Sequence, residues 1–285
     1  MQLRFVEDRR TLVWAFVLFP LLPLLAYVKP QLFPWLVPLA LYCSYCAGVL
    51  AHNHNHCAVF VSRRVNLAYG AWLSFFYGFP LFGWVPTHNQ NHHRYLNGAG
   101  DVARTSRHAG KDTLLAALSY PLACSRWQLP LVWRYARDAF TSRPARRARL
   151  ERVLLECSVV LLGHLGACAL ACSLHGLSLG LLVYFGAVGA PALLATYWMM
   201  LTNYLQHVGC DAGSAHDHSR NFVAPFWNWF VFDNGLHTVH HQNPGLHWSR
   251  YRALHELSRP LTQPSLNHGS LFGYVQRRYF SAARR

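Results

Sequence analysis

The sequence predicts an all-α integral membrane protein, and three observations support this fold class. Of the 285 residues, 53% are hydrophobic and 13% are charged, whereas a soluble domain carries about 25% charged residues. Several apolar stretches reach the roughly 17–25 residues that a membrane-spanning helix needs. The chain also contains 18 histidines, many of them in short motifs beside these stretches. We therefore expect about four transmembrane helices and a histidine-rich helical cap, with the spans at 11–28, 31–51, 153–174 and 177–201.

The first two spans follow each other directly. Three arginines among the first ten residues precede an apolar run, as they do in a signal peptide. No small-residue cleavage site follows, so we expect an uncleaved anchor. Lys29-Pro30 marks the turn between the two spans. The second span leads into a histidine motif at His52, which places this motif where the helix leaves the bilayer.

The apolar segment 65–86 separates the histidine motif at His52 from the next one, which begins at His88. A segment that crossed the bilayer here would put the two motifs on opposite faces of the membrane. Glycine and proline interrupt it repeatedly, and a bent backbone is tolerated at membrane depth where protein buries it. We therefore predict a re-entrant or interfacial hairpin, with breaks at Gly70, Gly78, Pro80 and Gly83.

Arginine supplies most of the net charge of +15. The loop 94–152 holds eleven arginines and Lys111, so the positive-inside rule places it in the cytoplasm, together with both termini and all histidine motifs. The link His175-Gly176 has no Lys or Arg and is predicted to lie outside. Within the loop, 114–136 predicts an amphipathic helix on the membrane surface. Such a charge indicates contact with anionic lipid, and the strong hydrophobicity argues against a nucleic-acid partner.

The remainder of the chain reads as surface and interface. Residues 208–223 are polar, 224–232 form an aromatic interfacial segment, and the tail 249–285 is basic and is expected on the surface. We treat 1–285 as a single membrane-embedded domain in a bacterial inner membrane. The eight cysteines, many in apolar runs, are expected to pack as small side chains and not to form disulfides.

The histidine motifs predict a metal site. In a helix, residues i, i+3 and i+4 share one face, as in His237-Thr-Val-His240-His241, and imidazole is the commonest side-chain metal ligand. His54 faces away from its neighbours in the first motif, so its role as a ligand is left open. Nine imidazoles exceed the four ligands of a zinc site and suit two metals. The predicted ligands are His52, His56, His88, His92, His93, His207, His237, His240 and His241.

Metals held only by neutral nitrogen keep a high positive charge, so nearby carboxylates are expected to orient the rings from behind. Asp101, Asp211, Asp217 and Asp233 each lie close in sequence to a motif, and His247 is a further candidate for this role. The other histidines are expected to be packed or solvated side chains: His108, His164, His175, His216, His218, His255 and His268.

The succession HxxxH, HxxxHH, NxxxH and HxxHH around four spans resembles the membrane fatty acid desaturase/hydroxylase superfamily, from about Thr11 to Trp248. This resemblance implies a di-iron centre held by the nine histidines, which activates O2 and removes hydrogen from an unactivated C–H bond. It also implies that Asn203 acts through a metal-bound water and that Asn234, which begins the Asn234-Gly-Leu-His237 context, supports a ligand from behind. No cytochrome b5 or ferredoxin-like domain is fused to the chain, so a separate ferredoxin, rubredoxin or cytochrome b5 is expected to supply electrons.

The function that this resemblance implies first is fatty acid desaturation, on a free acid, a thioester or a lipid. The same ligands also suit a fatty acid hydroxylase or a decarboxylase that forms a terminal alkene. A carotenoid or alkane oxygenase comes next, and a membrane metal-binding protein without catalysis is the alternative from another class. The acyl chain is expected in an apolar tunnel lined by residues of 67–82 and 197–200.

Overall fold

The computed structural model describes residues 2–141 and 147–281, which are mostly helical. Its contacts divide the chain into two compact units. The first, here called the span unit, comprises Met1–Pro86 and Leu131–Met199; the second, the histidine unit, comprises Thr87–Pro130 and Met200–Arg285. Hydropathy carries no signal for a division of contacts of this kind, and the single membrane-embedded domain 1–285 stays a prediction.

Four helices of the described residues are long and apolar enough to cross a membrane: Asp8–Val28, Pro30–His56, Arg147–His175 and Leu177–His207. This confirms the prediction of four candidate membrane helices. The third begins at Arg147, six residues before the expected start, because arginine is a good helix former and prolongs the helix beyond the apolar run. Its start corrects the predicted loop 94–152, which ends in helix.

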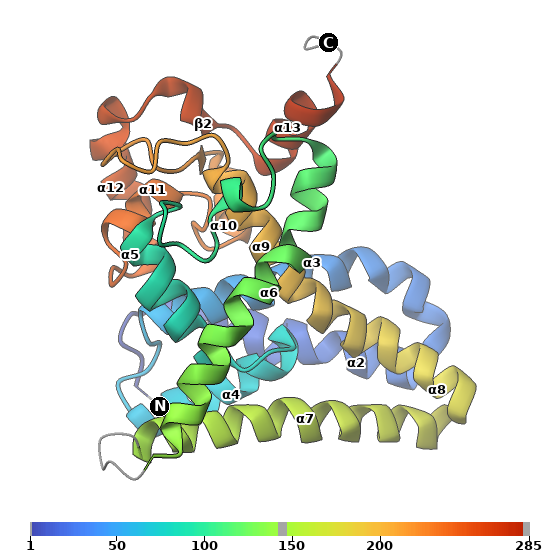
Figure 1. Ribbon diagram of the computed structural model, residues 1–285. Coiled ribbons are helices and arrows are strands. Elements are labelled where there is room, and N and C mark those ends of the chain that lie inside the picture. Colours follow the sequence, from blue (N-terminus) through green and yellow to red (C-terminus); the bar gives the residue numbers. More distant parts are fainter. Residues whose placement is uncertain (1, 142–146, 282–285) are drawn as a thin grey trace. The chain divides into compact units, whose positions relative to one another are not determined.

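The candidate spans are built from consecutive helical segments (Figure 1). A π-helical turn interrupts the first and the fourth span, at Trp14–Leu18 and Phe185–Gly189. Small and aromatic side chains, including Ala26, Tyr27 and Ala171, form a buried core between segments of the span unit. The bounds are α1 Asp8–Val13, η1 Trp14–Leu18, α2 Phe19–Val28, η2 Pro30–Leu32, α3 Phe33–His56, α7 Arg147–His175, α8 Leu177–Tyr184, η7 Phe185–Gly189 and α9 Ala190–His207.

Helix α4 (Arg63–Tyr77) occupies most of the segment that was expected to form a hairpin. Ser62 caps its first turn, and the helix ends at Gly78, whose φ of 72° lies in the left-handed region that glycine favours. A Cβ atom at Gly78 would also lie 2.7 Å from the carbonyl oxygen of Ala192. Pro80 and the short helix η3 (Leu81–Gly83) follow. The chain therefore breaks and turns at Gly78.

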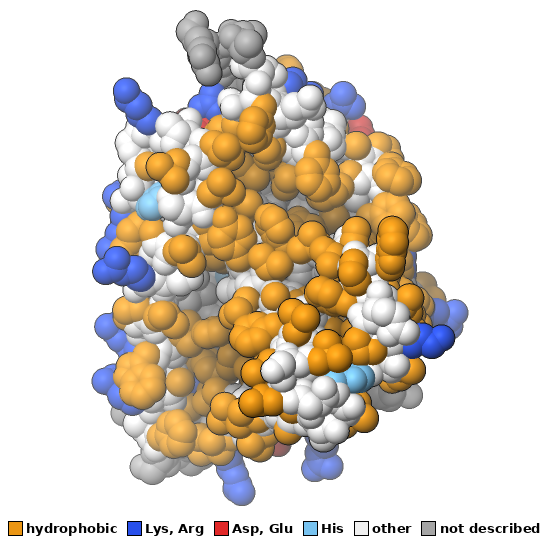
Figure 2. Space-filling view, turned by 90° about the vertical axis from the view of Figure 1, so that its right-hand side faces the viewer, with side chains coloured by type: hydrophobic (Ala, Val, Ile, Leu, Met, Phe, Trp, Pro, Cys, Tyr) orange, Lys and Arg blue, Asp and Glu red, His pale blue; other side chains and the backbone are white. Residues whose placement is uncertain are grey.

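Apolar side chains cover much of the span unit's surface. In the helix Arg147–His175, only 11% of the most apolar stretch is buried. Leucines such as Leu161, Leu162 and Leu165 are exposed. Figure 2 shows hydrophobic side chains over most of one face of the molecule, with Lys and Arg side chains at its margins. A patch of this extent marks an interaction surface on a soluble protein; on helices of spanning length it fits contact with lipid.

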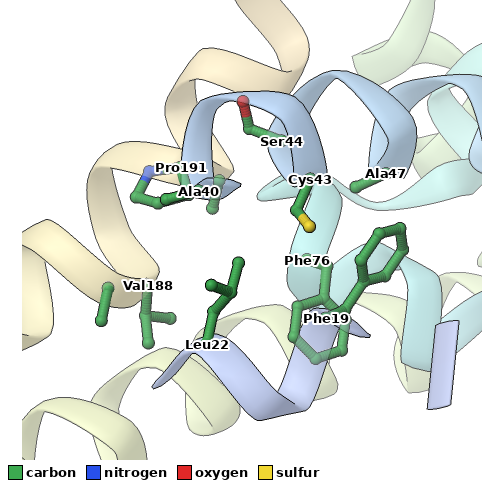
Figure 3. A pocket seen from close by; sticks show the side chains of 11 residues that line it. Phe19, Leu22, Ala40, Cys43, Ser44, Ala47, Phe76, Val188 and Pro191 are labelled. Atoms are coloured by element: carbon green, nitrogen blue, oxygen red, sulfur yellow. The ribbon is translucent and has the colours of Figure 1, made fainter. Parts of the chain in front are cut away.

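A small apolar cavity lies inside the span unit, between α2, α3, α4 and the η7–α9 segment (Figure 3). The rings of Phe19 and Phe76 lie against each other at one end, with centroids 5.4 Å apart. Its volume of about 30 Å³ is close to the share of a single liquid water molecule. This cavity is too small for an acyl chain, and the predicted tunnel along 67–82 and 197–200 stays a prediction.

The histidine unit contains shorter elements. Helix α6 (Leu114–Ala139) begins in this unit and extends the helix expected at 114–136, and α9 ends here at His207. A two-residue parallel pairing of β1 (Asn221–Phe222) with β2 (Asn267–His268) is the small departure from an all-α fold. The other elements are η4 Val85–His92, α5 His93–Tyr95, η5 Thr105–Arg107, α10 Pro225–Phe230, α11 His237–Gln242, η8 Trp248–Arg250, α12 Tyr251–Ser258, η9 Arg259–Leu261, η10 Pro264–Leu266, α13 Leu271–Val275 and η11 Gln276–Phe280.

Candidate metal centre

Four buried imidazoles converge in the histidine unit. His92 comes from η4, His207 ends α9, and His237 and His241 lie one turn apart on α11. One nitrogen from each ring lies within 4.8 Å of the others, and all four residues are buried. The predicted motifs NxxxH, HxxxHH and HxxHH therefore meet at one point.

Three of these nitrogens form a close triangle. The Nε2 atom of His207 lies 3.0 Å from Nε2 of His237 and 3.1 Å from Nε2 of His241. The Nε2 atoms of His237 and His241 are 2.9 Å apart. Each nitrogen of a neutral imidazole is either a donor or an acceptor, so at least one of the three contacts joins two nitrogens of the same kind and is not a hydrogen bond.

The outer nitrogens fix which ring atoms carry the protons. Nδ1 of His207 lies 3.0 Å from the carbonyl oxygen of His218 and must donate to it. Nδ1 of His92 lies 2.6 Å from Oδ2 of Asp101. In a neutral imidazole the other nitrogen then holds a lone pair, and Nε2 of His92 is buried without a hydrogen-bond partner among the described residues. Both lone pairs point into the cluster, which is the arrangement that a bound cation requires.

Burial keeps two rings of this cluster, His207 and His241, in the form that binds metal, because it lowers their pKa. The pKa of His241 lies well below its usual range, first because the ring is buried and then because His237, His93, His92 and His207 surround it. Only the neutral imidazole can bind a metal. The donor set therefore fits a cation held by nitrogen.

A π-helix explains the spacing of the second motif. In an α-helix, residue i+5 turns away from residue i, which would separate His93 from His88. The segment η4, Val85–His92, is π-helical, and its i→i+5 hydrogen bonds bring His93 back above His88. The Nε2 atoms of these two residues are 3.1 Å apart. The sequence spacing predicted that His88 and His93 share a helix face, and the π-helix explains why they do.

A second group of histidines lies beside the first within the histidine unit. The His93 ring lies 4.7 Å from that of His240 and 4.5 Å from that of His241, measured between centroids. His88 stacks on His240 at 5.9 Å. Nδ1 of His240 contacts the hydroxyl of Tyr251 at 2.9 Å, and no sequence motif predicts this partner.

The first motif lies on the last turn of α3 in the span unit. His52 and His56 stand one turn apart, with ring centroids separated by 4.8 Å. His54 faces elsewhere: its Nε2 lies 3.2 Å from the carbonyl oxygen of Asn66, and its Nδ1 lies 3.4 Å from the amide nitrogen of Val59. These backbone contacts use both of its ring nitrogens.

Asp101 is held in place to support His92. Its carboxylate accepts hydrogen bonds from the amides of Asn97, at 2.8 Å, and Ala103, at 2.7 Å. Burial raises the pKa of Asp101, but His92 and the backbone amides outweigh this effect and lower the pKa to about 2. Asn97 adopts a left-handed φ of 67° and also donates from its side chain to the carbonyl oxygen of His207. It therefore links two ligand-bearing segments, and no sequence motif announced it.

The comparisons with known proteins agree with this geometry. The family described as fatty acid desaturase matches residues 29–269. The chain belongs to the fatty acid desaturase family. No curated protein and no solved structure gives a match. Membership confirms the resemblance found in the histidine motifs. The matched residues contain all of the predicted ligands and the candidate spans that follow Lys29.

Arg220 anchors the end of α9 in this desaturase-family chain. Its guanidinium donates to the carbonyl oxygens of Leu205 and, at 3.1 Å, of Val208, on either side of the predicted ligand His207. The last carbonyls of a helix have no partner within the helix, and a basic side chain satisfies them here. Arg220 is buried and was not predicted as a site residue.

A tight turn positions α11. Phe232 and Asp233 adopt left-handed φ angles of 51° and 54°. Gly235 follows, and a Cβ atom there would lie 2.4 Å from the carbonyl oxygen of Phe222 and 2.6 Å from Oδ1 of Asn228. Asn228 also accepts from the Gly235 amide at 3.1 Å. The Asn-Gly-Leu-His context of this desaturase-family motif thus has a local cause, a backbone approach that only glycine permits.

The remaining predicted supporting residues have other contacts. The side chain of Asn203 donates to the hydroxyl of Tyr120, and the Asn234 carbonyl accepts from Gln206. Asp233 pairs with Arg252 at 2.9 Å. His247 contacts Ser249. The exposed residue Asp211 accepts from the Gly213 amide, and Asp217 binds Gln263.

Two histidines that were expected to be packed or solvated have defined places. His218 is buried, its ring lies 5.5 Å from that of His241 between centroids, and its carbonyl oxygen holds His207. Its position in the loop between two ligand-bearing helices is the one sequence signal that singles it out. His164 packs within the span unit, where its nitrogens contact the Tyr184 hydroxyl and the Phe75 carbonyl at 3.0 Å each.

Proposed function

We propose that this protein is an O2-dependent di-iron oxidoreductase that acts on a fatty acyl chain, in the first place a fatty acid desaturase. The observation that carries the proposal is the buried cluster of His92, His207, His237 and His241 in a chain of the fatty acid desaturase family. One ring nitrogen of each residue lies within 4.8 Å of the others, and the fourth of the four candidate membrane helices ends at His207.

Seven of the nine proposed iron ligands belong to the histidine unit, and His52 and His56 of α3 complete the set. We exclude His54, because its two ring nitrogens already contact backbone atoms of Asn66 and Val59. The iron pair supplies the capacity to activate O2 for cleavage of an unactivated C–H bond. The chain's own residues orient the imidazoles, and burial keeps the rings of His207 and His241 neutral by lowering their pKa.

The number of imidazoles in the chain favours a pair of irons over zinc, because it exceeds what one tetrahedral zinc site uses.

The membrane arrangement that we propose follows from the order of the spans. The segment 65–86 forms a re-entrant or interfacial hairpin, supported by the break of α4 at Gly78. The histidine motifs and both termini then lie on the cytoplasmic face, and a single membrane-embedded protein of a bacterial inner membrane results. Substrate reaches the site from the lipid as a free acid, a thioester or a lipid, and a separate ferredoxin, rubredoxin or cytochrome b5 supplies electrons.

Fatty acid hydroxylation and terminal-alkene formation are the alternatives within the same chemistry. The outcome depends on which substrate carbon lies nearest the metals, and product analysis separates the three. A carotenoid or alkane oxygenase follows, and a metal-binding membrane protein without catalysis is the last alternative. Against a transporter, the four clustered ligands follow or end the apolar spans and do not lie in their middle.

The proposal is tested by metal analysis of the full chain purified in detergent under anaerobic conditions. We expect about two irons per chain, with a Mössbauer spectrum of a coupled, nitrogen-ligated pair. His237→Ala should lose iron, whereas His216→Ala should retain it, because His216 contacts Gln242 outside the cluster. Mass spectrometry of the fatty acids of an expressing cell then identifies the product. One zinc per chain, or no bound metal, would contradict the proposal.

A further inference from the structure

A large pocket in the histidine unit plays no part in the proposed metal centre. It has a volume of about 610 Å³ and is lined by the residues that follow α9, by β2 and by the C-terminal helices α13 and η11. Val208 and Gly209, which line it, come directly after the ligand His207. Its lining also includes Arg220, Arg277 and Arg278. We call it the arginine pocket.

Positive charge in this pocket is only partly neutralised. Asp112 is the one acidic residue of its lining, and it is occupied: it pairs with Arg278 at 2.7 Å and accepts hydrogen bonds from Tyr279 at 2.7 Å and Tyr204 at 3.2 Å. Arg277 forms no ion pair with any residue that the structure describes. The lining therefore holds three guanidinium groups and one carboxylate, and this carboxylate pairs with Arg278.

Arg220 is a buried cation without a carboxylate partner among the described residues. It is 7% exposed, its two terminal nitrogens donate to backbone carbonyls, and its side chain lies over the Tyr274 ring at 4.5 Å. Its Nε atom is buried and has no hydrogen-bond partner in the described part of the chain. A buried charge of this kind is costly unless a counter-charge compensates it.

His268 reports the same positive field. Its ring lies 4.7 Å from that of Tyr274, between centroids, and lines the pocket. Burial lowers its pKa first, and Arg220 and Arg277 lower it further, to about 4. The imidazole is therefore neutral at physiological pH, and the pocket's charge comes from its arginines.

From this arrangement we propose that the arginine pocket binds an oxyanion group, a carboxylate or a phosphate. Guanidinium groups bind both oxyanions through paired, charge-assisted hydrogen bonds. A pocket of about 610 Å³ suits a compact anionic group, since ligand pockets usually measure about 300–1,000 Å³. The binding itself does not depend on the proposed reaction; only an assignment of the anion as the carboxylate of the acyl substrate rests on it.

A bound anion would also affect the proposed metal centre. Arg220 lines the pocket and holds the carbonyls on both sides of His207. An anion that binds the Arg220 guanidinium would therefore shift the segment that positions His207, a proposed metal ligand. Arg220 has this structural role, so Arg277, which is exposed and unpaired among the described residues, is the better residue for a test.

The test is arginine modification by phenylglyoxal, mapped by mass spectrometry on the full chain in phosphatidylcholine nanodiscs. The added anions are inorganic phosphate, hexadecanoate with hexadecanol as its uncharged counterpart, and, in separate nanodiscs, phosphatidic acid. At about ten times the dissociation constant of the anion, labelling of Arg277 and Arg278 should slow about tenfold. Labelling of the exposed residue Arg259, outside the pocket, should not change.

A variant makes the result specific. Arg277→Gln removes one charged donor, so the anion concentration that protects Arg278 should rise about tenfold, whereas Arg259→Gln should leave it unchanged. Protection by hexadecanoate and not by hexadecanol supports a carboxylate ligand. Protection by phosphate or phosphatidic acid alone supports a phosphate ligand, free or on a lipid.

Equal protection of Arg277 and Arg259 would overturn the proposal, because a diffuse basic surface would explain it. Lack of protection by every anion would overturn it as well. The labelling needs neither iron nor O2, so an inactive or zinc-containing protein still reports on the pocket. Failure of the proposed function and failure of this site therefore give different results.

Discussion

At the scale of single residues, Asp101 shows how the protein prepares a ligand. Its carboxylate accepts from the Nδ1 atom of His92 and from two backbone amides, which fixes the ring and leaves Nε2 for a metal. Asp101→Asn should lower metal affinity about 10–100-fold, the usual effect of losing such a partner. Competition with a chelator measures it. The exposed residue Asp211 supplies the matched control, Asp211→Asn, and equal affinity in the two variants would contradict the role of Asp101.

Arg220 supports the metal centre through the backbone. Arg220→Met keeps much of the apolar stem but removes the donors to the Leu205 and Val208 carbonyls. We expect a loss of unfolding free energy of about 2 kcal/mol, the scale of hydrogen bonds to a charged group, and weaker metal binding through a more mobile His207. Thermal unfolding in detergent tests this. Arg259→Met, at an exposed site, should change little; an Arg220→Met protein as stable as that control would be unexpected.

At the scale of elements, the motif spacings indicated which residues meet but not how. The i, i+4 pairs His52/His56 and His237/His241 read correctly as helix faces. His93 at i+5 needed a π-helix, which hydrophobic periodicity does not reveal, because it depends on backbone hydrogen bonds and not on side-chain pattern. Asn97 and Tyr251 were equally unpredictable, since each reaches a ligand through tertiary structure from a loop or a separate helix.

The turn before α11 offers a test at this scale. Gly235→Ala would place a Cβ atom 2.4 Å from the Phe222 carbonyl oxygen, so β1 and the turn must move apart and shift His237. We expect a destabilisation of about 1–3 kcal/mol, typical of overpacking, together with reduced metal content. Gly245→Ala is the matched control, because nothing lies within 4 Å of its Cβ position. Elemental analysis and thermal unfolding of both variants decide the matter.

At the scale of the whole molecule, hydropathy located the four candidate spans within a few residues, since long apolar runs have few alternatives to a bilayer. Hydropathy does not predict the two compact units, because α6 and α9 each continue from one unit into the other and no linker marks the boundary. The arginine pocket was also unpredictable. In the sequence its basic residues indicate only membrane topology, and the structure alone shows that β2, η11 and the residues after α9 line one pocket.

The proposed topology makes a prediction about the segment 65–86. If it forms a hairpin, single cysteines at Val61 and Gly110 lie on the same, cytoplasmic side, and one at Ser178 lies outside. In a background without the eight native cysteines, an impermeant maleimide should label Ser178→Cys in intact cells. It should label Val61→Cys and Gly110→Cys only after lysis. All three sites are exposed in the structure, so packing within the protein does not hide them.

The alternative topology gives a different pattern. If the segment crossed the bilayer, Val61 and Gly110 would lie on opposite sides, and one of them would be labelled in intact cells. His52 and His56 would then be separated by the membrane from His88, and nine histidines could not share one centre. Labelling of one site without the other would therefore reduce the centre to the histidine unit alone, with its four clustered imidazoles as the only buried metal site left to explain the chemistry.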